Sequence, residues 1–200
     1  MPAPDPRPLR TQRRLLDAII ALAETRDLST VSVSEIARAA NIDRGTFYLH
    51  YADKGAFMNA VISMLLEEFE EMGSAFEKPA MYEQSGLRLS EIPSLYKVIG
   101  KHPALYRQFL GKSGSSDFYN RLQAQMEAQF VRLFQVQDPP TICGTIPLSV
   151  RARFATSGLL GFVTLWLEEC NEDEIDTYTW WAWELLTSIG LQMPVMIAEE

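Results

Sequence analysis

The chain has 200 residues, enough for one domain or two small ones, and 47% of them are hydrophobic and 22% charged. This globular composition excludes a disordered, collagen-like or coiled-coil protein, and two cysteines are too few for a disulfide framework or a four-ligand zinc site. No apolar run reaches the roughly 20 residues that span a membrane and no signal peptide is recognisable, so we expect a cytoplasmic protein without a membrane partner.

Charge is distributed unevenly along the chain. The net charge of −8 taken alone argues against a nucleic-acid partner. Residues 1–55, however, hold eight basic and seven acidic side chains, a balance of +1, whereas residues 56–200 hold ten and nineteen, a balance of −9. Such an asymmetry indicates an N-terminal module that faces a polyanion.

Apolar residues recur at helical spacing along nearly the whole chain, and no alternating strand pattern occurs. We therefore expect an all-α protein of about nine helices. Residues 73–91 have a mixed pattern, and residues 137–147 read as a loop. The predicted helices span residues 9–26, 33–40, 44–51, a long stretch from 54, and residues 92–100, 103–111, 117–135, 149–170 and 174–193.

Helix-capping residues mark the early boundaries. Ser32 followed by Glu35 is a capping-box pattern, which predicts a helix start at residue 33. Asn41 stands where a helix ends in the left-handed conformation, which Asn tolerates better than most residues. Asp43 and Asp53 are then predicted to cap the two helices that follow.

Two short helices therefore meet at a tight turn near Asn41. Ala37 is small, as the crossing of the next helix requires, and Ile36, Ile42 and Phe47 are spaced to form a small core. This pattern is typical of a helix-turn-helix, whose second helix enters the major groove of DNA.

The second of these helices carries side chains suited to DNA. Arg44 can donate in a fork to guanine, Gly45 allows the backbone to approach closely, and Thr46 offers a hydroxyl and a methyl group. Tyr51 is expected to lie partly in the core, and His50 could instead be a surface histidine without a partner. The predicted phosphate donors are Tyr48, His50, Tyr51 and Lys54, together with Ser32 and Ser34 at the start of the preceding helix.

At these positions the chain resembles the tetracycline-repressor (TetR) family of bacterial transcription regulators. The matching residues lie within about residues 10–60, with Asn41 in place of the family's usual Gly and Tyr51 in place of its usual Phe. The resemblance implies a three-helix DNA-binding domain over residues 1–55 and an all-helical effector-binding and dimerisation domain over residues 56–200. The matched positions are Ile36-Ala37, Asn41-Ile42, Asp43-Arg44, Gly45-Thr46-Phe47-Tyr48, His50-Tyr51 and Asp53-Lys54.

The resemblance also implies an effector pocket among the middle helices. Aromatic and sulfur side chains there are its candidate lining, and a packed core is the alternative for each of them. The candidates are Phe69, Met72, Tyr96, Tyr106, Phe109, Phe130, Phe134, Phe162 and Trp166.

The last two helices carry apolar residues on more than one face, and small residues allow two helices to approach closely. A four-helix bundle made from two copies explains this excess, and a monomer with a buried hairpin is the alternative. The candidate interface residues are Ala155, Gly158, Gly161, Trp180, Trp181, Trp183 and Leu186.

Catalysis finds little support, because His50 and His102 are the only histidines and no nucleotide-binding, metalloprotease or hydrolase motif occurs. We expect no cofactor and no metal, since the acidic cluster at residues 67–71 reads as a solvated face. The expected function is a homodimeric regulator, by default a repressor, that binds a palindromic operator and responds to a small molecule. The alternatives are an activator, a regulator controlled by a protein partner, an effector-free architectural DNA-binding protein, or an all-α enzyme.

Overall fold

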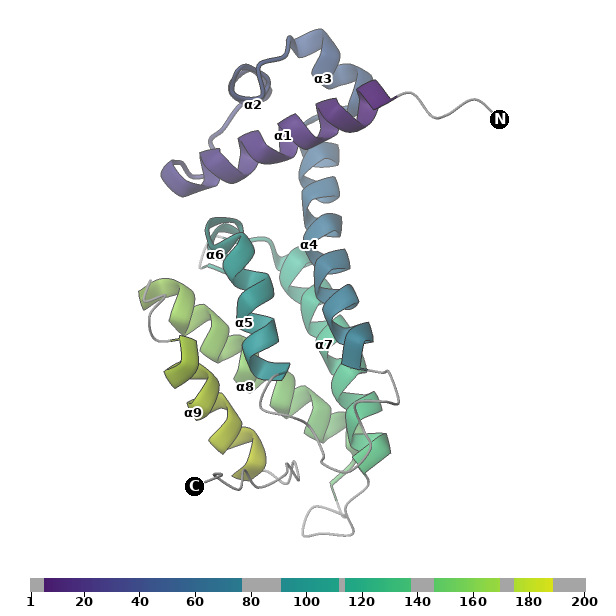
Figure 1. Ribbon diagram of the computed structural model, residues 1–200, viewed down its shortest axis with the longest axis vertical. Helices are drawn as coiled ribbons and strands as arrows, with labels where there is room; N and C mark the ends of the chain where they lie inside the picture. Colours follow the sequence, from purple (N-terminus) through teal and green to yellow (C-terminus); the bar gives the residue numbers. More distant parts are fainter. Residues whose placement is uncertain (1–5, 77–90, 112–113, 138–145, 170–174, 189–200) are drawn as a thin grey trace, which may run out of the picture.

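The computed structural model describes residues 6–76, 91–111, 114–137, 146–169 and 175–188. Within these ranges the chain forms nine helices and no strand (Figure 1), which confirms the predicted all-α fold. The helices are α1 (Pro6–Thr25), α2 (Val33–Ala39), α3 (Arg44–His50), α4 (Lys54–Phe76), α5 (Glu91–Lys101), α6 (Pro103–Leu110), α7 (Ser116–Gln137), α8 (Leu148–Glu169) and α9 (Ile175–Ser188).

The observed helix ends differ from the predicted ones by a few residues. The first helix begins at Pro6, because Pro is tolerated in a first turn, and α3 ends at His50 with Tyr51 as its C-cap. The mixed stretch 73–91 contains the end of α4 and the first residue of α5, and its residues 77–90 lie outside the described ranges. Most of the predicted loop at 137–147 and the end of the predicted last helix lie outside them as well.

The helices form two groups along the molecule (Figure 1). Helices α1, α2 and α3 lie at one end around the first turns of α4, and α4 then runs alongside α7 toward the other end. Helices α5 to α9 form the second group, in which α7 packs along α8 and α9 folds back against α5 and α8. The predicted domain boundary at residue 55 falls in the first turn of α4, which continues without a break.

The apolar side chains of the first group form one end of a continuous hydrophobic core. Ile19 of α1, Ile36 of α2 and Phe47 of α3 are fully buried, as the helical spacing of apolar residues predicted. Phe57 of α4 joins them, with its ring centroid 5.6 Å from that of Phe47. The start of α4 is therefore part of the N-terminal core.

The core of the second group is rich in aromatic rings. The Tyr96 ring lies edge-on to Trp166 at 5.3 Å between centroids, which joins α5 to α8. Phe118 of α7 packs against Tyr106 and Phe109 of α6, at 5.8 Å and 5.2 Å. These contacts fix the short helix α6 between α7 and α8.

A set of polar bonds joins the two groups at the turn after α1. Gln108 of α6 donates from Nε2 to the Arg26 carbonyl at 2.9 Å and accepts from the Leu28 amide at 3.3 Å. From the other side, Lys54 Nζ at the start of α4 donates to the carbonyls of Leu28 and Ser29, at 2.7 Å and 3.0 Å. We call residues 26–29 the anchored turn, because α4 and α6 both hold it.

Candidate DNA-binding surface

The start of α2 is fixed by the predicted capping box. The Ser32 hydroxyl accepts from the Glu35 amide at 3.3 Å, and the Ser32 amide donates to Glu35 Oε2 at 2.8 Å. The same hydroxyl donates to Glu35 Oε2 at 2.7 Å, and Arg26 donates to the other carboxylate oxygen at 3.3 Å. Glu35 is thus held in place between α2 and the end of α1.

These bonds favour the ionised carboxylate. Hydrogen bonds from the Ser32 amide and hydroxyl, helped by the Arg26 charge, lower the pKa of Glu35 from 4.5 to about 2. At the start of α3, bonds from the Thr46 hydroxyl and amide likewise lower the pKa of Asp43. Each helix start of the motif therefore includes a carboxylate, Glu35 at N3 of α2 and Asp43 at the N-cap of α3, that stays charged at neutral pH.

The capping box predicts an acid sensitivity of the fold. A group whose folded pKa lies below its unfolded pKa stabilises the fold above the unfolded value, and this contribution disappears as the pH falls from 4.5 through about 2. We therefore expect the melting temperature of the wild-type protein to fall more steeply over this acid range than that of Glu35→Gln, whose amide does not titrate. Circular dichroism melts of both proteins measure the difference, and parallel curves would contradict the assignment.

The turn between α2 and α3 is a Schellman motif. The Asn41 amide donates to the Arg38 carbonyl at 3.1 Å, and the Ile42 amide donates to the Ala37 carbonyl at 3.0 Å. Asn41 has a φ of 52°, the left-handed conformation that the sequence predicted for this position. The geometry of the helix-turn-helix is thus set by local chemistry.

The start of α3 uses Asp43 as its predicted N-cap. Asp43 Oδ1 accepts from the Thr46 amide and Oδ2 from the Thr46 hydroxyl, both at 2.7 Å. A Cβ placed on Gly45 would lie 2.9 Å from Asp43 Oδ1, so any larger residue here would force the capping carboxylate to shift. The hydroxyl proton of Thr46 is already used, which leaves its methyl group and lone pairs for a partner.

The outer face of α3 points away from the core because Phe47 is fully buried. Arg44 and Tyr48, one turn apart, both point to solvent. Arg44 Nη2 donates to the Tyr48 hydroxyl at 3.3 Å, and the guanidinium lies 5.8 Å from the centre of the ring. Leu49 is 85% exposed, yet the sequence prediction did not include it. Its spacing of four residues from Gly45 and two from the buried Phe47 was the signal that could have found it.

The remaining predicted DNA contacts lie in different surroundings. Ser34 is exposed and His50 is half-buried, with its ring 6.4 Å from that of Tyr51. Tyr51 packs against Phe57 at 5.0 Å, and burial raises the pKa of its hydroxyl. Lys54 donates two of its three ammonium protons to carbonyl oxygens of the anchored turn. Ser34, Arg44 and Tyr48 are thus exposed, whereas Tyr51 and Lys54 also hold the fold together.

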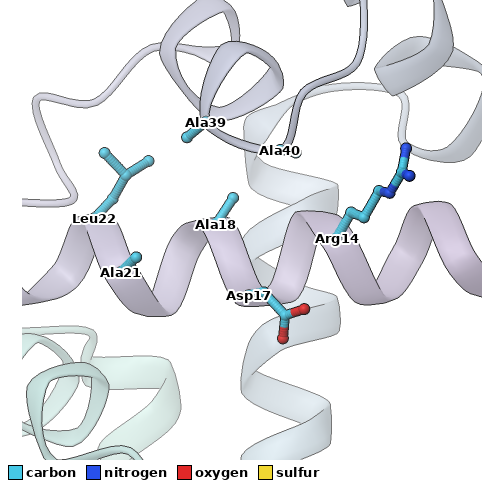
Figure 2. Close-up of a pocket in the computed structure, with 7 residues that line it drawn as sticks. All are labelled: Arg14, Asp17, Ala18, Ala21, Leu22, Ala39 and Ala40. Carbon is cyan, nitrogen blue, oxygen red and sulfur yellow. The ribbon is translucent and has the colours of Figure 1, made fainter.

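A hollow of about 350 Å³ lies between α1 and α2. Figure 2 shows Ala18 and Leu22 of α1 directed toward α2, where Ala39 and Ala40 form the opposite wall, with Arg14 at one end. Small side chains on both helices leave this space open. None of the nine predicted effector-pocket residues lines it.

The predicted effector-pocket residues lie instead among α4–α8, as core or near-core side chains. Phe130 and Phe162 are half-buried and pack against the core, and the side chain of Met72 lies outside the described set. Whether any of them contacts an effector stays a prediction. The buried ones are Phe69, Tyr96, Tyr106, Phe109, Phe134 and Trp166.

The predicted dimer residues divide into buried and exposed ones. Ala155 and Leu186 are buried inside the chain, and the side chain of Trp183 is not among those described. Gly158 and Gly161 are exposed, and a Cβ on either would meet no atom within 4 Å. We define the outer apolar face as the exposed apolar side chains and glycines of the last two helices: Val150, Phe154, Gly158, Gly161 and Leu165 of α8, and Trp180, Trp181 and Leu185 of α9.

Metal-ligand clusters and membrane-spanning helices are both absent from the described part of the chain. No group of three or more His, Cys, Asp or Glu side chains is arranged to hold a metal ion there. Among the same residues, none of the helices combines the length and apolar character that crossing a bilayer requires.

Comparison with known proteins shows which family of proteins this chain resembles. The model of bacterial regulatory proteins of the tetR family matches residues 15–61. The chain is 41% identical over 59 residues to the uncharacterised HTH-type transcriptional regulator YxbF of Bacillus subtilis, covering 29% of this chain and 16% of that protein. It is 29% identical over 111 residues to the HTH-type transcriptional regulator EthR of Mycobacterium tuberculosis, covering 51% of each. The chain thus spans about half, or less, of the length of these relatives.

The fold extends the likeness beyond the matched residues. The crystal structure of the transcriptional regulator FadR from Bacillus subtilis, in complex with stearoyl-CoA, aligns with a TM-score of 0.64 at 16% identity. The alignment covers 88% of this chain and 97% of FadR, so the C-terminal helices share the arrangement as well. The family match over residues 15–61 and the fold of the described helices together make this chain similar to the TetR family of bacterial regulatory proteins.

Proposed function

We propose that this chain is a homodimeric transcription regulator of the cytoplasm. It binds a palindromic DNA operator through residues 1–55 and is controlled by a small molecule bound within residues 56–200. The observation that carries the proposal is the outer face of α3, where Arg44, Tyr48 and Leu49 are exposed on a helix whose start, turn and core contacts are all fixed. A rigid helix with exposed side chains is what base recognition in the major groove requires.

The charges of the N-terminal helices support a DNA partner. Arg10, Arg13 and Arg14 are exposed on α1, and Arg38 is exposed on α2. They lie in the part of the chain whose balance is +1, whereas the rest carries −9. We infer that DNA contacts only this end of the molecule, and that affinity depends firmly on base contacts because the phosphate attraction is modest.

The outer apolar face supports a second copy of the chain as partner. Phe154 is 64% exposed, and Gly158 and Gly161 follow it along α8 with open space above them. A helix of a partner subunit can approach closely where side chains are absent, and the exposed tryptophans of α9 extend the apolar area. One α3 reads one half-site, so a two-fold dimer also accounts for a palindromic operator.

Buried hydroxyls in the C-terminal helices support a small-molecule effector. Tyr96 Oη of α5 and Thr156 Oγ1 of α8 are fully buried and have no hydrogen-bond partner among the residues that the structure describes. Buried polar groups are nearly always paired, so a ligand with polar atoms would stabilise this interior. FadR of Bacillus subtilis, a structural neighbour, binds stearoyl-CoA, which shows that this fold can accept such a ligand. From the resemblance to the TetR family, we propose that the chain is a repressor and that the effector releases it from its operator. An activator would use the same DNA contacts.

The burial of most predicted pocket residues favours a second candidate, an effector-free DNA-binding protein with a solid C-terminal core. The two candidates differ in one measurable property. Only an effector that binds the DNA-free and DNA-bound forms unequally changes operator affinity. Operator titrations with and without acyl-CoA thioesters and other metabolites distinguish them.

The DNA assignment predicts that Arg44→Ala weakens binding to the operator selected by the wild-type protein from random duplexes. The expected loss is about 1–3 kcal/mol per half-site, with relaxed preference at one base pair, because a bidentate contact to guanine is removed. Fluorescence anisotropy titrations with the operator and its single-base variants measure both effects.

Arg121→Ala is the matched control for Arg44→Ala. It removes the same charge from an exposed arginine of α7, which pairs with Asp117 in the C-terminal group. We expect its operator affinity to equal that of the wild type. Equal affinities for both variants would remove Arg44 from the DNA interface, and failure of the wild-type protein to select any sequence would refute the proposed function.

A further inference from the structure

We infer that Leu49 reads the methyl group of a thymine in each operator half-site. The inference rests on the proposed DNA-binding function and assigns one element of its specificity. Leu49 is 85% exposed, the highest exposure among the large hydrophobic side chains of the described residues. Little of its side chain is covered by the described residues, although Phe47, two residues away, is fully buried.

The geometry of α3 directs Leu49 outward. Successive residues of a helix are about 100° apart, so the positions two before and two after Phe47 both lie opposite to it. These positions are Gly45 and Leu49, and they lie one turn apart on the same face. The centre of the outer face of α3 is therefore a glycine followed by a leucine.

This centre has no side-chain hydrogen-bonding group. Gly45 has no side chain, and Leu49 carries only carbon atoms. The polar groups of α3 lie on its flanks, where Arg44 and Tyr48 bond to each other and Thr46 bonds to Asp43. The base pair that meets the centre of the face is thus recognised through an apolar contact.

Only one natural base offers an apolar group to the major groove. Thymine carries a C5 methyl group there, whereas guanine, adenine and cytosine present hydrogen-bond donors and acceptors. A leucine placed against cytosine or a purine would cover polar edges without pairing them, which is unfavourable. Gly45 assists, because its missing side chain lets the start of α3 approach the base edges and brings Leu49 into range.

The test replaces thymine by deoxyuridine, which keeps every hydrogen-bonding group and lacks only the methyl. Each thymine of the selected operator is replaced in turn, symmetrically in both half-sites, and dissociation constants are measured with the full-length protein. We expect one thymine position at which the wild-type protein loses about fourfold in affinity per half-site, the effect of one buried methyl group. The remaining thymines should show no such loss.

Variants assign this loss to Leu49. Leu49→Ala should bind thymine and deoxyuridine operators equally at that position, and Leu49→Met should keep part of the discrimination because it restores an apolar side chain of similar length. Both changes lie at an exposed position, and circular dichroism melts check that both variants fold.

The possible results distinguish a failure of the Leu49 inference from a failure of the proposed DNA-binding function. A selected operator without thymine in its half-sites, a wild-type protein indifferent to every methyl group, or a Leu49→Ala variant with full methyl sensitivity would each overturn this inference and leave the DNA-binding function intact. Failure to select any operator would overturn the proposed function, and the inference with it.

Discussion

Phe47→Ala should destabilise the protein by about 3–5 kcal/mol, which is a large part of the total stability of a typical domain. Phe47 is fully buried, and its ring contacts those of Tyr51 and Phe57 at centroid distances of 5.8 Å and 5.6 Å. Its removal leaves a cavity at the point where α3 meets the start of α4. Urea unfolding at 25 °C measures the change in the free energy of unfolding.

Leu49→Ala is the control for this prediction, because it removes a similar apolar side chain from the same helix at an exposed position. We expect it to change the free energy of unfolding by no more than about 0.5 kcal/mol. If both variants lost the same stability, the α3 core would not be the one described. If Phe47→Ala lost less than about 1 kcal/mol, the packing around it would carry little of the stability.

Gly158→Glu should abolish dimerisation and weaken binding to a full palindromic operator by about 10²–10⁴-fold, because the two half-sites are then no longer bound as one unit. Within one chain the substitution meets open space, since no atom lies within 4 Å of a Cβ at this position. The effect should therefore come from the blocked approach of the partner subunit and from an unpaired charge buried against its apolar face. Sedimentation velocity measures the oligomeric state.

Gly158→Ala is the matched control. Alanine stays small enough for close helix contact and favours the helix over glycine by about 1 kcal/mol, so this variant should remain dimeric and melt at a higher temperature. A second disruptive variant, Phe154→Ser, removes the largest exposed apolar side chain of α8 and should also yield monomers. Dimers that persist in Gly158→Glu and Phe154→Ser would move the interface away from the outer apolar face.

The local features of the N-terminal helices were predictable from the sequence because short-range chemistry determines them. The Ser32–Glu35 capping box, the left-handed Asn41 and the Asp43 cap each depend on residues at most a few positions apart. The buried Ile36 and Phe47 followed from their helical spacing for the same reason. The anchored turn could not be predicted, since Gln108 lies 80 residues from Leu28 in the chain and its amide has no motif.

The sequence also could not predict which face of α8 points outward. Its residues are apolar on most sides, so no periodic pattern identifies the outward-facing positions, and neighbouring residues differ by 100° in direction. Ala155 was predicted to contact a partner and is buried, whereas the adjacent Phe154 is exposed. The sequence also could not show which of the predicted pocket residues line a cavity, because an aromatic side chain that lines a cavity and one that fills a core follow the same sequence pattern.

The anchored turn determines where the DNA-binding helices can pivot. The stretch Ala52–Asp53 before α4 looks like a short linker, and a rotation there alone would move α1–α3 as a separate body. Such a rotation would break the Gln108 bonds to residues 26 and 28 and pull the Lys54 ammonium from two carbonyls. Because of these bonds, we expect helices α1–α3, the first turn of α4 and α6 to move together as one body. A change in the position of these helices relative to the rest of the molecule would have to alter the contacts that α6 makes with α7 and α8.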